Sequence, residues 1–579
     1  MKVRHCIAVA AAIALPACRP AAPLSPADLV LRSGKVVTLV DAEPEAQAVA
    51  VAGYSILAVG SDDEIARHIG PETRVIDLEG RLVIPGFIEG HGHFMNLGAA
   101  RMSIGLADAS SWDEIVERVA RAVARVAPGE WIQGRGWHQE KWDSVPADAV
   151  QGVPTNDTLS AVSPNNPVLL THASGHASLA NDRAMAEAGI TASTSDPAGG
   201  TIVRDGAGKP TGMLRETAQR LVRHALSAAL QQRGPEALER DAEHQIELAG
   251  RESLRHGITT FHDAGATFAE IDRFKRLASE GRLPVRLYVM VRGESIEAMA
   301  RQLPEYRTLP SGDDFVSVRS IKHQIDGALG SHGAWLIEPY EDMGGSDGLV
   351  LETVEQIERT ARLAIDYGFQ VNTHAIGDRA NREVLDIYER AFEIDPRHPD
   401  RRWRIEHAQH LHPSDIPRFA ALGIIASMQG VHCASDGPWV SKRIGEARAR
   451  SGAYVWRSLI DSGAIVTNGT DVPVESIDPI ANFQASVTRR ASDGSVFYGD
   501  QKMTREEALR SYTLSNAYAA FEENLKGSLE PGKLADIVVL SHDILTVPVA
   551  QLSEARVELT VLGGKIRYQR RPEGATQAQ

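Results

Sequence analysis

The segment Val83-Ile84-Pro85-Gly86-Phe87-Ile88-Glu89-Gly90-His91-Gly92-His93 is an apolar run that leads directly into a His-x-His pair. Its apolar part, Val83–Ile88, predicts a buried strand. Because strand side chains repeat every second residue, His91 and His93 would point the same way at the end of this strand. Two neutral imidazoles at one strand end supply half of a divalent metal site.

Seven further segments predict strands, and helical stretches such as Val354–Tyr367 and Asn381–Phe392 lie between several of them. The segments are Ile258–Phe261, Val285–Met290, Val316–Ile321, Phe369–Thr373, Trp403–Ile405, Ile424–Met428 and Ala464–Thr467. Eight strands with interleaved helices predict an α/β fold, a (β/α)8 TIM barrel over residues 83–526. The long gap after the first strand, about residues 95–255, predicts an insertion over the barrel mouth.

Both ends of the chain carry short β segments separated by glycines. One set occupies residues 27–82, and the other occupies residues 527–570, where a hairpin is expected through Gly563-Gly564. The simplest arrangement is one small composite β-sandwich domain made from both chain ends, with the barrel inserted between them.

The first residues predict export. A basic start precedes the Ala-rich apolar run Cys6–Ala14, which is too short to cross a bilayer as a helix. We therefore expect a signal peptide over residues 1–18 and a tether over residues 19–26. Leu15-Pro16-Ala17-Cys18 resembles a bacterial lipoprotein processing site with Cys18 as the lipidated residue, and plain secretion is the alternative. The expected location is the periplasm, or a lipid anchor at the bacterial cell envelope.

The overall composition excludes several classes of partner. The chain is 43% hydrophobic and 24% charged, as in ordinary soluble globular proteins, and its net charge is -15. Nucleic acid and anionic membrane surfaces both require basic patches, so neither is expected as the main partner. Only Cys433 lies outside the targeting region, which excludes an internal disulfide. The expected partner is a small molecule, membrane contact is expected only through Cys18, and a homo-oligomer is left open.

Polar residues follow five of the predicted strands. They are His91, His93, Lys322, His374, His407 and Asp471. All six fall at C-terminal strand ends, which is the face where barrel active sites are built. Four histidines, a lysine and an aspartate match nitrogen and oxygen ligation of zinc, and manganese or iron can use the same ligands.

With these motifs, the chain resembles the amidohydrolase superfamily, in particular the amidohydrolase 3 branch with N-substituted formamide deformylase-like metal-dependent hydrolases. The resemblance runs from about Ala27 to Tyr568. Its motifs are Pro85 to His93, Lys322 to Gly330 with Pro339-Tyr340, Ile405-Glu406-His407-Ala408-Gln409 and Asp471-Val472-Pro473-Val474-Glu475. One departure is Glu89, which stands where the family usually has Asp at a position that is not a ligand.

The resemblance implies a binuclear centre, expected to hold two zinc ions. His91, His93 and Asp471 would hold one metal, and His374 and His407 would hold the second. Lys322 would bridge the two after carboxylation by CO2, since a carbamate is an anionic oxygen ligand and an ammonium has no lone pair. The alternative is an uncarboxylated Lys322 near a single metal.

The expected reaction is hydrolysis of a non-peptide C–N bond of the amide type, by attack of a metal-bridging hydroxide on the carbonyl carbon. Asp471 is expected to act as general base and proton shuttle. His176 resembles a family position that faces the substrate and assists the oxyanion, and a structural polar contact is its alternative role. Two other functions stay open, a mononuclear deaminase or cyclic-amide hydrolase on the same barrel, and an exported binding protein without catalysis.

Six further residues are candidates for substrate binding. Trp137, His138, His172 and Glu216 lie in the predicted insertion, and Gln429 and His432 follow the seventh strand. For Trp137 the alternative to substrate binding is packing in a hydrophobic core. The sequence does not identify the substrate among acyl amides, N-formyl compounds, carbamates and cyclic amides.

Overall fold

The computed structural model describes residues 26–139, 142–144, 146–173, 175, 177–197 and 200–571. The predicted signal peptide with Cys18, and the tether up to residue 25, lie outside the described residues. Within the described ranges, the structure contains no helix that is both long and apolar enough to cross a membrane.

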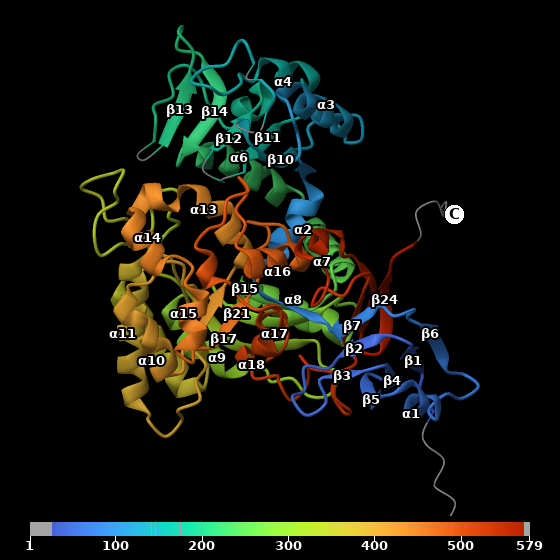
Figure 1. Cartoon of the computed structure of the whole chain (residues 1–579). Helices are drawn as coiled ribbons and strands as arrows, with labels where there is room; N and C mark the ends of the chain where they lie inside the picture. The colour runs from blue at the N-terminus through green and yellow to red at the C-terminus, as the bar shows by residue number, and fades with distance from the viewer. Residues whose placement is uncertain are drawn as a thin grey trace, which may run out of the picture.

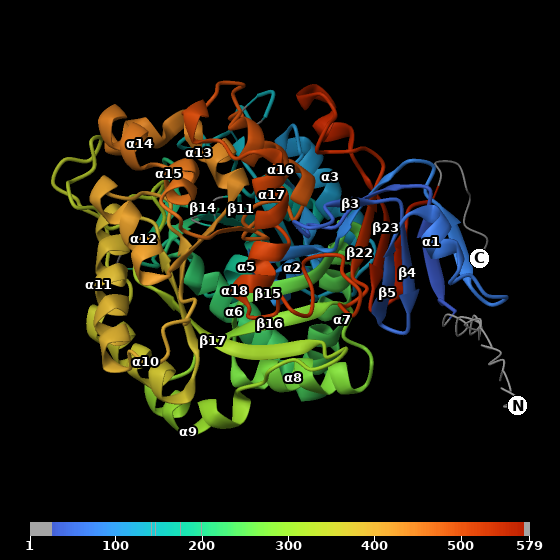
Figure 2. The ribbon, with the colours of Figure 1, turned by 60° about the horizontal axis from the view of Figure 1, so that its bottom comes forward.

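Eight parallel strands, hydrogen-bonded in chain order, form the central sheet (Figures 1 and 2). They are β8 (Phe87–Gly92), β15 (Ile258–Ala266), β16 (Arg286–Val291), β17 (Val316–Gln324), β18 (Gln370–Ala375), β19 (Arg404–His407), β20 (Ile425–Met428) and β21 (Val466–Asn468). The first and last strands meet, because the Asp471 N–H donates to the His91 carbonyl at 2.7 Å and the His93 N–H to the Val472 carbonyl at 2.8 Å. The predicted barrel is therefore confirmed.

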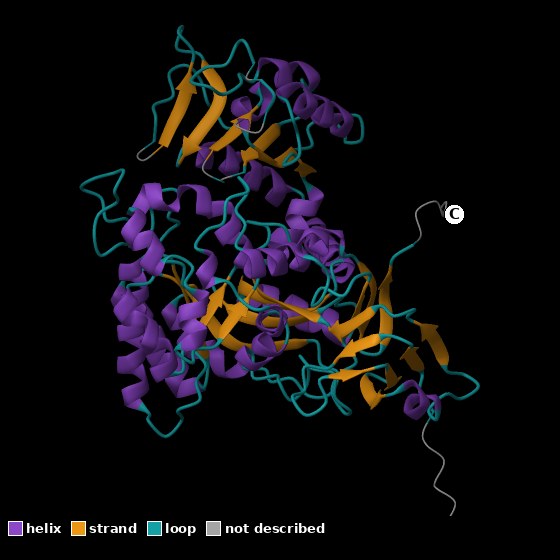
Figure 3. Cartoon of the chain, viewed as in Figure 1, coloured by secondary structure: helices purple, strands orange, loops and turns teal. Residues whose placement is uncertain are grey.

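Helices surround this sheet (Figure 3). They are α8 (Phe268–Ser279), α9 (Ile296–Tyr306), α10 (Val354–Tyr367), α11 (Asp378–Ile394), α12 (Ile416–Leu422), α13 (Gly430–Ile444), α14 (Glu446–Gly452), α15 (Trp456–Asp461), α16 (Pro479–Thr488), α17 (Arg505–Ser511) and α18 (Leu514–Ala519). In α10, Thr353 and Gln356 form a capping box at the start, and Gly368 ends the helix in the left-handed conformation. Its apolar face, which includes Ile357 and Ala361, is buried in the core around the barrel.

The predicted strand Val83–Ile88 is two strands in the structure. β7 (Leu82–Pro85) pairs with β2 (Lys35–Val37) and β22 (Ile537–Leu540), whereas β8 begins at Phe87 in the barrel. Gly86 separates them at a point of close approach, since a Cβ atom there would lie 2.2 Å from Thr259 Oγ1. The apolar run continues across the junction because both strands are buried, and so the sequence pattern gives no sign of the change of sheet.

Both chain ends build two sheets beside the barrel. One has the order β5 (Ser55–Gly60), β4 (Ala48–Ala52), β1 (Leu29–Arg32) and β6 (Arg74–Asp77), with α1 (Asp62–Ala66) after β5. The other has the order β24 (Lys565–Gln569), β23 (Val557–Leu562), β22, β7, β2 and β3 (Glu45–Ala46). Leu31 and Val51 of the first sheet share a core with Val539 of the second, while Val538 packs into the barrel core. The inner strands β22 and β7 of the six-stranded sheet therefore form a middle layer with both faces buried.

The predicted insertion lies between β8 and β15. It starts with α2 (Phe94–Met102) and returns through α7 (Pro235–Arg255). Its six-stranded sheet has the order β13 (Gly200–Arg204), β14 (Pro210–Glu216), β12 (Ala177–Ala180), β11 (Val168–His172), β10 (Ile132–Trp137) and β9 (Ile104–Gly105). The insertion also contains the helices α3 (Trp112–Val123), α4 (Asp157–Val162), α5 (Asp182–Glu187) and α6 (Gln219–Gln232). Two apolar clusters of its own support this sheet. In Figure 1 the insertion lies over α13, on the side of the barrel mouth.

Candidate metal centre

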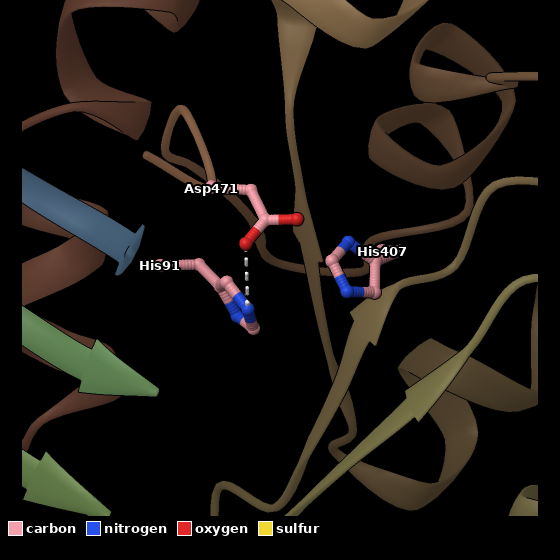
Figure 4. Close-up of side chains that lie close together, drawn as sticks. All are labelled: His91, His407 and Asp471. Atoms are coloured by element: carbon pink, nitrogen blue, oxygen red, sulfur yellow. Dashed lines mark ion pairs between the residues drawn. The ribbon is translucent and has the colours of Figure 1, made fainter. Parts of the chain in front are cut away.

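The structure brings together all six residues that the sequence places at strand ends. His91 lies in β8 and His93 just after it, Lys322 in β17, His374 in β18, His407 at the end of β19, and Asp471 after β21. Figure 4 shows the side chains of His91, His407 and Asp471 converging. Each of these three residues offers one ligand atom, and the three atoms lie within 4.8 Å of one another.

Lys322 and His93 adjoin this cluster. Lys322 Nζ lies 3.4 Å from Nε2 of His91. Asp471 Oδ1 lies 3.6 Å from the same His91 nitrogen and 3.2 Å from Nε2 of His93. Asp471 Oδ1 is buried, and among the described residues no well-aligned hydrogen bond reaches it. Two imidazole nitrogens, the lysine nitrogen and a carboxylate oxygen thus meet within a few ångströms.

Two of the histidines have their ring orientation fixed from outside the cluster. His91 Nδ1 contacts Oε2 of Glu406, and His407 Nδ1 lies 2.8 Å from Oε1 of Gln429. A neutral imidazole that donates through Nδ1 keeps its lone pair on Nε2. Both rings are therefore held in the form that can bind a metal through Nε2.

His374 joins the cluster through its ring, which lies 4.5 Å from the ring of His407. Its Nε2 is 3.5 Å from Oδ1 of Asp326. Asp326 also accepts backbone N–H bonds from Ile376 and Gly377 at 3.0 and 2.8 Å. Burial raises the pKa of Asp326 to about 7, although these hydrogen bonds lower it. The sequence gives Asp326 no role, and its only signal is its place two residues beyond the end of β17.

Burial keeps the imidazoles of His91, His374 and His407 neutral. It lowers the pKa of His91 and of His374 well below the ordinary value, and it lowers the pKa of His407 to about 4. Burial alone would raise the pKa of Asp471, but its contact with Nε2 of His93 and the nearby rings of His91 and His407 hold that pKa well below its usual range. Neutral imidazoles around an ionised carboxylate form a donor set that fits a divalent cation.

Unusual backbone conformations place two of the candidate ligands. His407 has φ 76° and Asp471 has φ 57°, both in the left-handed region. Strict strand alternation would turn His407 away from the face occupied by Arg404 and Glu406. The left-handed turn at His407 lets it join Glu406 inside the barrel. Such strained positions gather at functional sites.

Two substrate-binding candidates lie beside the cluster. Gln429 contacts His407 as described, and it precedes α13. His432, within α13, has its ring 6.1 Å from that of His407, with the two planes 20° apart. Gln409 donates from Nε2 to Nδ1 of His432 at 3.1 Å, a partner that the sequence did not reveal.

The substrate-binding candidates in the insertion lie in three different environments. Trp137 is 1% exposed, and its Nε1 donates to the Leu170 carbonyl at 3.0 Å, so it lies in the insertion core instead of the expected pocket wall. The ring of His172 lies 4.6 Å from that of His138, and its Nε2 is 3.2 Å from Gln139 Oε1. Glu216 ends β14 on the surface. His176 lies outside the described residues.

A family model described as the amidohydrolase family matches residues 74–568 of the chain. The protein LONG AFTER FAR-RED 3 of Arabidopsis thaliana is 34% identical, over 94% of this chain and 92% of that protein. N-substituted formamide deformylase of Arthrobacter pascens is 29% identical, over 94% of this chain and 98% of that protein.

Among solved structures, an uncharacterised metal-dependent hydrolase from Pyrococcus furiosus superposes with a TM-score of 0.71 at 26% sequence identity. The match covers 90% of this chain and all of the other. Similarity therefore extends over the barrel, the insertion and most of the terminal sheets.

Proposed function

This chain belongs to the amidohydrolase family, and we propose that it uses a divalent metal to hydrolyse a non-peptide C–N bond of the amide type. The observation that carries the proposal is the convergence of His91, His407 and Asp471 at the barrel mouth, with Lys322 beside them. The similarity to N-substituted formamide deformylase supports the bond type.

The donor set favours two neighbouring metal sites. His91, His93 and Asp471 would hold one ion, and His374 and His407 the other. Lys322, carboxylated by CO2, would bridge them, and zinc suits these ligands, as do manganese and iron. A bound divalent ion supplies a Lewis acid for the carbonyl oxygen and lowers the pKa of a water molecule.

The protein's own groups would position the substrate and move protons. Asp471, ionised and beside both His91 and His93, would take a proton from the attacking water and pass it to the leaving nitrogen. His432 would donate from Nε2 to the carbonyl oxygen, whose negative charge grows as the carbon becomes tetrahedral. The role of His432 requires a neutral ring, which burial favours by lowering its pKa. The role of Asp471 requires an ionised carboxylate, which its lowered pKa favours.

The test combines metal content with turnover. We expect about two metal ions per chain in the wild type, fewer in Lys322→Ala, and hydrolysis of at least one member of a panel of N-formyl amines, N-acyl amines, carbamates and cyclic amides. A chelator should abolish this hydrolysis, and zinc should restore it. Metal-replete protein that cleaves no C–N bond in the panel would contradict the proposal.

A mononuclear deaminase or cyclic-amide hydrolase is the second candidate. It is favoured by the compactness of the group formed by His91, His407 and Asp471, which by itself offers three ligands to one ion. One ion per chain in both the wild type and Lys322→Ala would support this candidate and would remove the bridging role of Lys322.

A further inference from the structure

Glu406 lies between the candidate metal ligand His91 and a buried arginine. Its side chain is completely buried, and Oε2 contacts Nδ1 of His91. Arg404 contacts both carboxylate oxygens, with Nε 2.8 Å from Oε1 and Nη2 3.2 Å from Oε2. We propose that Glu406 is a positioning residue that holds His91 for metal binding, and that Arg404 holds Glu406; the inference rests on the metal site proposed above.

Arg404 ties this carboxylate to the frame of the barrel. Its Nη2 donates to the Gly90 carbonyl at 2.6 Å and lies 3.0 Å from Ser427 Oγ, and Nη1 lies 3.2 Å from Nδ1 of His262. Gly90, Ser427 and His262 belong to three different strands, β8, β20 and β15. The guanidinium is therefore held by four strands, including its own, and the position of Glu406 does not depend on any loop.

The charges explain why this pair can exist inside the barrel. A carboxylate without exposure to water requires a nearby cation and several hydrogen bonds. Arg404 supplies the cation, with its Nε 2.8 Å from Oε1, and one charge-assisted hydrogen bond, from Nη2 to Oε2 at 3.2 Å. Nδ1 of His91 contacts the same Oε2 atom, so this one carboxylate oxygen links Arg404 to the candidate metal ligand.

The contact with Glu406 acts on the ligand atom of His91. A carboxylate that accepts from Nδ1 fixes the tautomer, and it makes Nε2 a stronger donor to a metal. In the structure this Nε2 is the atom that faces Lys322 and Asp471. Losing such a partner typically weakens metal binding by about 10- to 100-fold.

A matched control exists in the same barrel. Glu522 is buried and pairs with Lys526, with Nζ 2.7 Å from Oε2, and it accepts from Ser317 Oγ at 2.6 Å. Ser317 lies near the start of β17, whereas Lys322 lies toward its end, so this pair is remote from the metal ligands. If Glu406 served only to stabilise the fold, Glu406→Gln and Glu522→Gln would have the same effects.

The experiment measures zinc affinity of the full chain by chelator competition after metal removal, together with thermal unfolding of the metal-free protein. We expect Glu406→Gln to bind zinc about 10- to 100-fold more weakly than the wild type. Glu522→Gln should bind zinc as the wild type does, even where both variants lose thermal stability. Cobalt in place of zinc should give a changed visible spectrum in Glu406→Gln alone.

A second variant covers the case in which Glu406→Gln does not fold, because that change leaves Arg404 without its counter-charge. The double change Glu406→Gln with Arg404→Met removes both charges and should also bind zinc weakly. Wild-type zinc affinity in either variant would overturn this inference and leave the proposed function intact. A wild type that binds zinc but hydrolyses no amide would overturn the proposed function alone, and a wild type that binds neither zinc nor manganese nor iron would overturn both.

Discussion

The side-chain amide of Gln409 donates a hydrogen bond to Nδ1 of His432, and this contact decides which ring nitrogen of His432 carries the proton. The proton must be on Nε2, which is buried and has no hydrogen-bond partner among the residues that the structure describes. Burial lowers the pKa of His432, so the ring is neutral near pH 7. His432 therefore presents one unused donor beside the candidate metal ligands.

Gln409→Glu should move the proton of the neutral His432 ring from Nε2 to Nδ1. The new carboxylate would accept from Nδ1, and Nε2 of a neutral His432 would then become an acceptor that repels a carbonyl oxygen. We expect kcat to fall by about 10- to 100-fold with a smaller change in KM, since the donor acts mainly on the developing oxyanion. Steady-state kinetics on the amide identified in the panel would show this. An unchanged kcat with normal metal content would remove His432 from the reaction.

Asp471→Asn should lower the hydrolysis rate while the protein still folds. The amide cannot take a proton from water, so the hydrolysis rate should fall by about 10²- to 10⁴-fold. Thermal unfolding checks that the barrel is retained, and metal analysis separates loss of the base from loss of a ligand. Retention of more than about a tenth of the rate in a metal-replete variant would assign the base to another residue.

Carboxylation of Lys322 should depend on pH in the metal-free protein. Burial lowers the pKa of its amine to about 8, and only the neutral amine attacks CO2. The amine is mostly protonated at pH 7 and mostly neutral at pH 9, so carbamate formation should accelerate about tenfold between these values at equal dissolved CO2. Carbon-13 NMR with labelled CO2 measures this, with Lys322→Ala as the blank. A rate independent of pH over this range would mean that Lys322 is not the group modified.

Gly86→Ala should destabilise the protein through overpacking. The added Cβ would meet the side chain of Thr259 at 2.2 Å, so we expect the free energy of unfolding to fall by about 1–3 kcal/mol. Gly344→Ala is the matched control, because a Cβ there meets nothing within 4 Å and its φ is not in the left-handed region. Denaturant unfolding of the two variants gives the comparison. Equal midpoints would show that the junction between β7 and β8 can adjust.

The sequence predicts the barrel well because each predicted strand is apolar over several residues and the candidate ligands follow predicted strands. It does not predict the break at Gly86, since β7 and β8 are both buried and form one continuous apolar run. The contact that requires glycine involves Thr259, which is distant in the sequence. Such close approaches become visible only when the strands are placed side by side.

In the candidate site, too, the sequence identifies some residues and cannot place others. His91, Lys322 and Asp471 are identified by residue type and position, because few other residue types can bind a metal there. The alternation rule cannot place Glu406 and its neighbour His407 on the same side, which requires the left-handed conformation of His407. Trp137 is a candidate for substrate binding in the sequence, with the core as its alternative, and in the structure it fills the insertion core. A large aromatic residue in a strand is compatible with either place.

The position of β22 between β7 and β23 affects how the chain is made. β7 leaves the ribosome before the whole barrel, whereas its antiparallel partner β22 follows the barrel in the chain. Until then β7 presents an unpaired apolar edge, the kind of edge at which nascent chains associate wrongly. Completing this sheet therefore waits until the barrel strands have been synthesised, and a chaperone that shields this edge on a growing polypeptide would raise the yield of native protein.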